Sequence, residues 1–301
     1  MAQPPDWVTI RVFLATLECG SITRAADRCA IATSAAAKRL QVLEADCGVA
    51  LLERTARGAR PTPAGEVFAR HAHGLRDLAA RLAGDLRAFA AGGLGSARLH
   101  ATASVLAGAA LPDALARFAA AHPGIVVELA EATSLAIVQA LRDGQADLGL
   151  ITTEARLPVG LDAHPWRRDR LLLVVPAGHA LAARPRIGFA EALDHPLIGV
   201  LQASAIALLV DGAAEKLGRR PDYRFRVEST DAARRLVAAG HGLTVMPDGV
   251  LRGYEQALGL KGIPLADPWA RRRLRLVSRP EAMLPPPARR LRDHLLAGAA
   301  G

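Results

Sequence analysis

The segment from Ser21 to Gly65 constrains the fold of this chain more than any other, because it predicts a helix, a turn, a second helix and a basic hairpin in close succession. A preceding helix is indicated by apolar residues at helical spacing, namely Trp7, Ile10, Phe13, Leu14 and Leu17. Gly20 is expected to end that helix and Ser21 to start the next one. The small pair Ala25–Ala26 lets another helix approach closely, and a turn is expected near Ala30–Ile31.

The helix after this turn has the layout of a DNA-recognition helix. We expect Thr33 or Ser34 to cap its start and Gly48 to end it. Its predicted inward-facing residues are Ala37, Leu40 and Leu43, and its predicted outward-facing residues are Lys38, Arg39 and Gln41. A helix fits the major groove and its first turns reach base edges, so we expect Thr33, Ser34 and Lys38 to read sequence. Arg39 is expected to contact phosphate.

The stretch from Val49 to Arg60 alternates apolar and arginine residues around a turn at Arg57–Gly58. This pattern is typical of a two-stranded hairpin, called the wing below, whose arginines contact the DNA backbone or the minor groove. A solvated hairpin is the simpler explanation, and similar helix pairs occur in proteins that do not bind DNA. The presence of the wing at this distance from the helix pair favours DNA binding. The candidate DNA-binding residues are Thr23, Arg24, Thr33, Ser34, Lys38, Arg39, Arg54 and Arg57.

This segment resembles the winged helix-turn-helix of LysR-type transcriptional regulators. The matching residues are Phe13-Leu14, Gly20-Ser21-Ile22-Thr23-Arg24-Ala25-Ala26, Leu43-Glu44, Gly48-Val49, Leu51, Arg54-Thr55, Arg57-Gly58 and Thr62-Pro63-Ala64-Gly65. The family usually opens its recognition helix with a run like Ser-Gln-Pro-Ala-Val-Ser-Arg, whereas this chain has Ala-Thr-Ser-Ala-Ala-Ala-Lys over residues 32–38. The resemblance implies a regulator that binds double-stranded DNA.

Length and composition agree with such a protein. A chain of 301 residues can hold a small DNA-binding domain and a larger domain with its own core. Hydrophobic residues make up 51% and aromatic residues only 4%, so the core must be aliphatic. The net charge of +9 favours an anionic partner. No apolar run is long enough to span a bilayer and no secretion signal is evident, so we expect a cytoplasmic protein without a membrane partner.

The three cysteines, Cys19, Cys29 and Cys47, all lie in the N-terminal domain. Their number is odd and their spacing matches no metal site, so we expect buried, reduced thiols, with a redox sensor as the alternative. We expect neither a metal nor a cofactor.

A seven-residue repeat follows the wing and predicts a linker helix with an apolar seam. The residues expected to form a dimer contact are Phe68, Leu75, Leu78, Leu82 and Phe89, with Leu86 at a neighbouring position. An amphipathic helix that packs on its own domain is the alternative. LysR-like proteins pair through a linker helix here, so the resemblance implies a homodimer, which can assemble further into a homotetramer. Residues 92–96, Gly-Gly-Leu-Gly-Ser, indicate a hinge.

From Ala97 onward, strands alternate with helices, which predicts a βαβ series. The expected strands are RLHAT, IVVELAEA, ADLGLIT, LLLVVP, PLIGVL, YRFRVES and GLTVMP, with helices at Ser104–Ala121, Ser134–Asp143, Ile206–Leu217 and Asp231–Ala239. This part resembles the effector-binding half of the same family, which has two α/β lobes like a periplasmic solute-binding protein. The resulting division is a DNA-binding domain at 1–65, a linker at 66–95 and an effector domain at 96–301. In it, lobe I comprises about residues 96–160 and 266–301, and lobe II about residues 161–265.

Hydroxyl residues stand at the starts of several of these helices, where unpaired backbone N–H groups and the helix dipole favour an anion. The candidate effector-binding residues are Thr102, Ser104, Thr133, Ser204 and Thr230. Simple N-capping explains any one of them equally well. Because the family layout brings such residues to one cleft between the lobes, we expect a small carboxylate effector there.

Two other classes of protein compete with this interpretation. A two-lobed α/β enzyme with an incidental helical domain is disfavoured, because the chain has no GxSxG, P-loop or HExxH motif. Its histidines at 164, 179, 195 and 241 also lack a partner pattern. A plain solute-binding protein is disfavoured by the missing signal peptide and by the attached DNA-binding domain.

Overall fold

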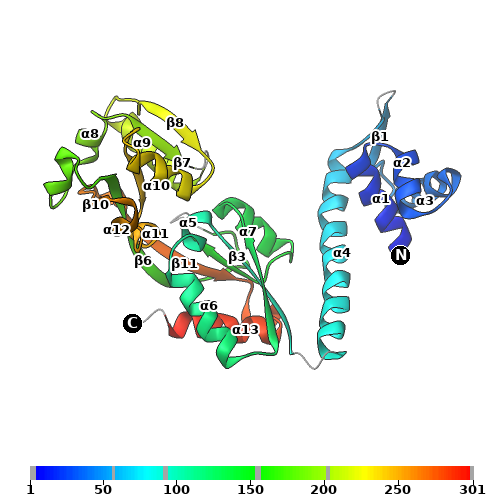
Figure 1. The fold of residues 1–301 in the computed structure, drawn as a ribbon. Helices are drawn as coiled ribbons and strands as arrows, with labels where there is room; N and C mark the ends of the chain where they lie inside the picture. The colour runs from blue at the N-terminus through cyan, green and yellow to red at the C-terminus, as the bar shows by residue number, and fades with distance from the viewer. Residues whose placement is uncertain (1–4, 56–57, 91–93, 153–156, 201–203, 299–301) are drawn as a thin grey trace. The chain divides into compact units, whose positions relative to one another are not determined.

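The structure, a computed structural model, describes residues 5–55, 58–90, 94–152, 157–200 and 204–298 (Figure 1). The chain divides into two compact units, one of residues 1–87 and 143–145 and the other of residues 88–142 and 146–301. Among the described residues, no helix combines the length and the apolar character that a bilayer crossing requires.

The N-terminal unit is a cluster of helices with a small hairpin. Its elements are α1 (Trp7–Cys19), α2 (Ile22–Cys29), α3 (Thr33–Cys47), β1 (Leu52–Thr55) and β2 (Gly58–Pro61). Gly20 and Gly48 end α1 and α3 in the left-handed conformation that glycine favours, with φ of 62° and 66°. Phe13, Leu14 and Leu40 are buried at the centre of the cluster, so the predicted helical cluster has one apolar core.

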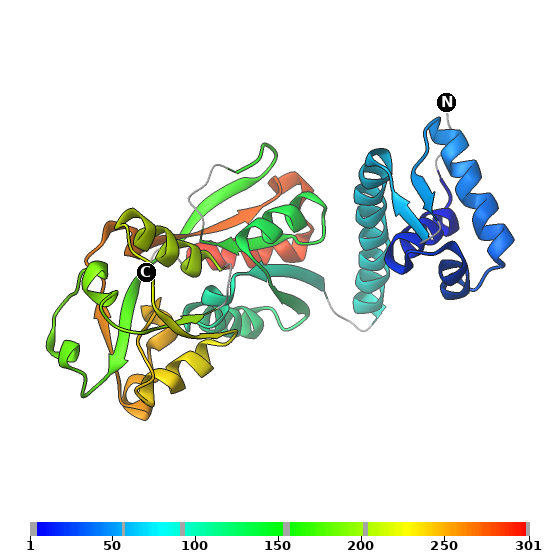
Figure 2. The same cartoon turned by 90° about the horizontal axis from the view of Figure 1, so that it is seen from above.

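Helix α4 (Pro63–Ala90) continues from this unit as one helix of 28 residues (Figure 2). Thr62 caps its start, because the Thr62 hydroxyl accepts a hydrogen bond from the Gly65 N–H at 3.0 Å. The start of α4 is therefore fixed to the end of the wing.

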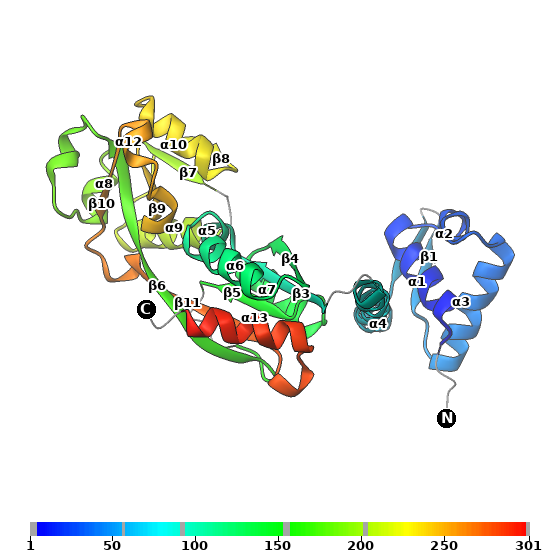
Figure 3. The ribbon, with the colours of Figure 1, turned by 60° about the horizontal axis from the view of Figure 1, so that its bottom comes forward.

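The C-terminal unit is built on a mixed sheet with the strand order β10-β6-β11-β5-β3-β4, and β9 also pairs with β6. The strands are β3 (Gly95–Ala101), β4 (Ile125–Glu131), β5 (Leu148–Ile151), β6 (Asp162–Pro176), β9 (Thr244–Pro247), β10 (Leu260–Pro264) and β11 (Arg271–Ser278). Strand β6 serves both lobes, because its first part pairs with β11 and its second part with β9 and β10 (Figure 3).

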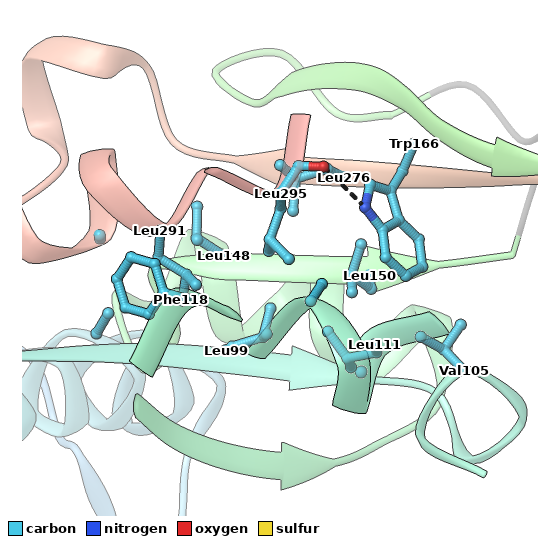
Figure 4. Packing of buried hydrophobic residues seen from close by; sticks show 14 of the residues in the cluster. Leu99, Val105, Leu111, Phe118, Leu148, Leu150, Trp166, Leu276, Leu291 and Leu295 are labelled. Atoms are coloured by element: carbon cyan, nitrogen blue, oxygen red, sulfur yellow. Dashed lines mark hydrogen bonds between the residues drawn. The ribbon is translucent and has the colours of Figure 1, made fainter. Parts of the chain in front are cut away.

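Lobe I packs helices on both faces of β3, β4, β5 and β11. Its helices are α5 (Ala103–Leu106), α6 (Ala110–Ala121), α7 (Ser134–Arg142) and α13 (Pro286–Ala297). Phe118 of α6 and Leu291 of α13 meet Leu99 and Leu148 of the sheet in one fully buried cluster (Figure 4). Trp166 closes this cluster and donates a hydrogen bond from its Nε1 to the Leu295 carbonyl at 3.2 Å. The C-terminal helix α13 thus belongs to the core of lobe I.

Lobe II has a second, parallel pair of strands, β7 (Leu197–Val200) and β8 (Tyr223–Val227). Its α-helices are α8 (Phe189–Ala192), α9 (Ala205–Lys216), α10 (Thr230–Ala238), α11 (Asp248–Leu251) and α12 (Glu255–Leu258). Short 3₁₀ helices lie at Ala180–Ala183, Pro268–Ala270 and Glu281–Met283, the last of them in the chain leading to α13. Two buried apolar clusters, one including Phe189 and the other Val237, hold these elements together. The predicted fold class, a winged helix-turn-helix with a linker helix and a two-lobed α/β domain, is confirmed.

Several details differ from the predictions. The expected helix from Ser104 to Ala121 is two helices, α5 and α6, because the chain turns at residues 107–109 around Gly108. The passage from lobe I to lobe II lies within β6, near Arg170, and not at residue 160, because the polar stretch 162–170 continues the strand. Ala36 is fully buried in α3 whereas Ala37 is only half-buried, since Ala36 shares a helical face with Leu40 and Leu43. Cys47 is exposed, and Cys19 and Cys29 are half-buried free thiols, so the prediction of buried cysteines is wrong.

Candidate DNA-binding surface and ligand cavity

The first turns of α3 present Thr33, Ser34 and Lys38 to solvent. The N-cap of α3 is Ala32, and no side chain makes a capping bond there, so the prediction that Thr33 or Ser34 caps the helix is wrong. As a consequence, neither hydroxyl is used for capping. The polar side chains in the first turns of α3 therefore lie exposed, without a capping bond.

Two of the predicted DNA-binding arginines bond within the N-terminal unit. Arg39 makes an ion pair with Asp6 at 2.6 Å and a hydrogen bond to Thr9 at 3.2 Å, which joins α3 to the start of α1. The Thr9 N–H and Arg39 lower the pKa of Asp6. Arg24 donates to the Cys19 carbonyl, and its neighbour Thr23 is exposed on α2. Arg39 and Arg24 therefore have structural partners that the sequence pattern did not indicate.

Hydrogen bonds to backbone groups of the wing and of the residue before it attach the wing to the helices. The Glu44 carboxylate accepts hydrogen bonds from the N–H groups of Leu51 and Leu52 at 2.8 and 2.9 Å. The Ala59 N–H donates to the Gly20 carbonyl at 3.0 Å. A Cβ on Gly58 would lie 2.1 Å from that same carbonyl oxygen, so only glycine fits there. Arg57 and the side chain of Arg54 lie outside the described residues.

Helix α4 carries an exposed apolar stripe. Leu75, Leu78, Leu82 and Leu86 recur along the helix with exposed fractions of 48%, 56%, 61% and 59%. Phe68, which was predicted to belong to this contact, is half-buried and packs edge-on against Phe13 with ring centroids 4.9 Å apart. It therefore belongs to the core of its own unit. The side chain of Phe89 lies outside the described residues.

In the C-terminal unit, a cavity of about 240 Å³ lies between the two lobes. All five predicted effector-binding residues line it, namely Thr102, Ser104, Thr133, Ser204 and Thr230. They come from the starts of α5 and α7 in lobe I and of α9 and α10 in lobe II. Much of the remaining wall is aliphatic, including Leu197, Ile198 and Met246. The cavity thus combines an apolar wall with the N-termini of four helices, which favour negative charge.

The five hydroxyls differ in what they already bond. Thr133 and Ser204 accept capping bonds from Ala136 and Ala207 at 3.3 and 3.1 Å, as the simpler interpretation predicted. Thr230 lies next to the actual cap of α10, Ser229. The side chain of Thr102 makes no capping bond. Its hydroxyl is buried and has no hydrogen-bond partner among the described residues, which makes it the strongest of the five candidates.

The lining of the cavity also includes an arginine, Arg226, that was not predicted from the sequence. Arg226 of β8 lines the cavity and lies over the ring of Tyr223, 4.0 Å from its centroid. Burial and a hydrogen bond from the Tyr223 hydroxyl to Asp211, at 2.7 Å, raise the pKa of Tyr223, so this ring is a fixed neutral platform. Among the described residues of the lining, Glu131 supplies the one carboxylate. The alternation of arginines in the segment YRFRV was the available signal.

Ser104 connects the cavity to the strands that join the lobes. Its hydroxyl accepts a hydrogen bond from Nη1 of Arg272 at 3.3 Å. Arg272 of β11 is buried and pairs with its cross-strand neighbour Asp169 of β6, with Nε to Oδ1 at 2.7 Å. A ligand that changes the bonding of Ser104 would therefore act on the passage between the lobes.

Comparisons with known proteins agree with both parts of the structure. The family described as bacterial regulatory helix-turn-helix protein, lysR family, matches residues 7–66, and the LysR substrate binding domain matches residues 90–300. The chain therefore belongs to the LysR family of bacterial transcriptional regulators. It is a DNA-binding regulator with a ligand-binding domain and not an enzyme.

Individual relatives span most of the chain. The uncharacterized HTH-type transcriptional regulator Rv2282c of Mycobacterium tuberculosis is 33% identical over 256 residues, which is 81% of each protein. The HTH-type transcriptional regulator BenM of Acinetobacter baylyi is 28% identical over 265 residues, 86% of this chain and 85% of BenM. The crystal structure of full-length CbnR complexed with its target DNA covers 98% of this chain and 100% of CbnR, with a TM-score of 0.72 at 24% identity. This last likeness shows the shared fold.

Proposed function

We propose that the chain reads its operator through α3 and the wing, and that a small carboxylate bound between the lobes controls this binding. In this proposal Thr33, Ser34 and Lys38 contact base edges, and the wing arginines Arg54 and Arg57 contact phosphate. The exposed first turns of α3 and the target-DNA complex of CbnR support the DNA-binding part. We place the DNA-binding domain at residues 1–65 and the effector domain at 96–301, in the cytoplasm.

The leucine stripe of α4 supports a homodimer, with a homotetramer as the further assembly. Four half-exposed leucines on one helical face leave apolar surface that a second α4 can cover. Two DNA-binding units in one dimer can engage two half-sites. Residues 66–95 would then serve as the dimerisation linker.

The observation that carries the effector proposal is that one cavity is lined both by the buried hydroxyl of Thr102, which has no partner among the described residues, and by a cationic group, Arg226. A carboxylate can take a charge-assisted hydrogen bond from Arg226, a hydrogen bond from Thr102 and N–H groups from the helix starts. The aliphatic wall accepts the apolar remainder of the acid. We therefore expect a compact carboxylic acid whose remaining atoms are mainly apolar.

Calorimetric titration of small carboxylic acids into the full chain tests this assignment. Loss of one charge-assisted hydrogen bond in Arg226→Gln should weaken binding by roughly 10- to 150-fold, and Thr102→Val by roughly 2- to 10-fold. Arg224→Gln is the matched control, because Arg224 is exposed on the same strand but does not line the cavity. An acid that binds the parent and both cavity variants equally well would show that the effector site lies elsewhere.

Binding must also change the DNA complex if the acid is an effector. A ligand shifts an equilibrium only by its difference in affinity for the two states, and a coupling of about 1–3 kcal/mol is typical. DNA footprinting with and without the acid should therefore show an altered operator affinity or pattern. The same footprint in both conditions would make the acid a ligand without a regulatory role.

A further inference from the structure

Glu18, near the end of α1, joins three helices of the N-terminal unit. Its Oε1 accepts a hydrogen bond from Nη1 of Arg76 in α4 at 2.8 Å, and its Oε2 pairs with Nη1 of Arg28 in α2 at 2.9 Å. Each carboxylate oxygen therefore has its own arginine. The hydrogen bond from Arg76, and secondarily the charge of Arg28, lowers the pKa of Glu18, so the carboxylate is ionised at neutral pH. Glu18 thus connects the helices that precede α3 to the linker helix.

The bond to Arg76 lies where α4 leaves the core of the N-terminal unit. Before this point α4 is packed closely, since a Cβ on Gly65 would lie 2.0 Å from the Leu51 carbonyl oxygen and Ala72 is 2% exposed. Arg76 follows Ala72 by four residues and therefore continues the same helical face. Within the described part of α4, Arg76 is the side chain farthest from the helix start that bonds to α1 or α2. It therefore restrains the direction in which the rest of α4 extends.

The leucine stripe that we propose as the dimer contact begins beside this bond. Leu75 is 48% exposed and directly precedes Arg76, and the stripe continues to Leu86. In a dimer held by the stripe, the direction of α4 relative to its own unit decides how far apart the two copies of α3 lie. Residues 77–90 rise by about 21 Å, so a tilt of about 10° at Arg76 displaces the unit by roughly 3–4 Å relative to the end of α4. This displacement is about one base-pair step of DNA.

We propose that Glu18 is a positioning residue that sets the spacing between the two half-sites that the dimer accepts on DNA. Apolar packing at Ala72 is non-directional, whereas a charge-assisted hydrogen bond fixes both a distance and an angle. The side chains of Glu18 and Arg76 are 34% and 39% exposed, so their pair contributes little to stability. Its geometric effect can therefore be measured in a folded protein. The inference rests on the proposed dimer through α4.

Selection of duplexes from a random-sequence library by the full chain tests the proposal. The parent should select pairs of half-sites at one spacing. Arg76→Ala and Glu18→Ala should select the same half-site sequence over several spacings, because α4 then leaves the unit at variable angles. One base pair inserted between the selected half-sites moves one of them by about 3.4 Å and rotates it by about 35°. This insertion should weaken binding by the parent at least tenfold and binding by Arg76→Ala less than about threefold.

Three further variants separate positioning from other roles of these charges. Arg28→Ala removes the second arginine and leaves the bond between Glu18 and Arg76, and Arg70→Ala removes an exposed arginine of α4. Both should keep the parent's spacing even if their affinity for all duplexes falls. Arg76→Lys can still donate to Glu18 and should restore the preference in part. If Arg76→Ala and Glu18→Ala keep the parent's spacing, the inference is overturned and the proposed dimer stands. Selection of single half-sites by the parent would overturn the proposed dimer and the inference with it.

A distance measurement tests the same claim without DNA. Cys47 is exposed at the end of α3, and Cys19→Ser/Cys29→Ser leaves it as the single thiol for a spin label. In the dimer, pulsed electron paramagnetic resonance should give one narrow distance between the two labels. Arg76→Ala in this background should broaden or shift that distance by several Å while Tm stays within about 5 °C of the parent. An unchanged distance distribution would overturn the positioning role of Glu18.

Discussion

Replacing Leu82 by Asp should dissociate the proposed dimer while leaving each chain folded. Leu82 is 61% exposed in the single chain, so more than half of its surface remains to be covered by a partner helix. Full burial of a leucine side chain contributes about 2 kcal/mol, so covering this fraction contributes roughly 1.2 kcal/mol. A symmetric dimer contains the residue twice, which gives roughly 2.4 kcal/mol and a dissociation constant at least about 50-fold higher. The buried carboxylate of Asp adds to this loss.

Sedimentation velocity over a series of protein concentrations measures this change directly. The matched control is Val159→Asp, because Val159 is a fully exposed apolar residue of the C-terminal unit, at 103%. The control should keep the parent's oligomeric state, and circular dichroism should show that both variants are folded. Unchanged assembly of Leu82→Asp would refute the reasoning and make α4 an amphipathic helix without a pairing role.

Three further predictions concern stability. Gly58→Ala should destabilise the N-terminal unit by roughly 1–3 kcal/mol, because φ is 127° there and the new Cβ would meet the Gly20 carbonyl; an unchanged Tm would contradict this. Arg272→Met should lower the free energy of unfolding by roughly 3–5 kcal/mol, because it leaves the carboxylate of Asp169 without its partner. Adding Asp169→Leu to the same chain should restore part of this free energy, which denaturant unfolding of the single and double variants measures. Burial, and secondarily Arg98, lowers the pKa of His100 below its ordinary 6.5. The unfolded chain therefore takes up a proton more readily than the folded one, so stability is complete above pH 6.5 and falls as the pH drops below it. His100→Gln should flatten this fall in the free energy of unfolding with pH, and an identical pH dependence in parent and variant would show that other groups cause it.

The N-terminal unit was predictable because local chemistry determines it. Glycine and serine at helix ends, apolar spacing and the basic hairpin each act over a few residues, and the structure agrees with them at Gly20, Gly48 and Ser21. The ion pair of Arg39 with Asp6 joins residues 33 positions apart, and no local pattern marks such a contact. The contact of Arg24 is local, since Cys19 is five positions away, but a backbone carbonyl acceptor leaves no mark in the sequence.

The alternation of strands and helices in the C-terminal unit was predictable from the sequence, but the full length of strand β6 was not. Residues 162–170 are mostly polar or basic, so they do not resemble a buried strand, yet pairing with β11 keeps them extended. The hydroxyl residues at helix starts were identified because parallel strands deliver such starts to one edge of a sheet. Arg226 was missed because its position in the cavity depends on β8 lying beside β7, which is a tertiary contact.

The most direct test of DNA recognition by α3 compares Lys38→Ala with the parent on two duplexes, one from upstream of the chain's own gene and one of random sequence. Loss of a base contact by Lys38 should cost about 1–3 kcal/mol, or roughly 5- to 150-fold, on the specific duplex. Binding of the random duplex should change little, because that binding depends mainly on phosphate contacts. Equal losses on both duplexes would contradict the account, since Lys38 would then be a phosphate contact and α3 would not read the sequence through it.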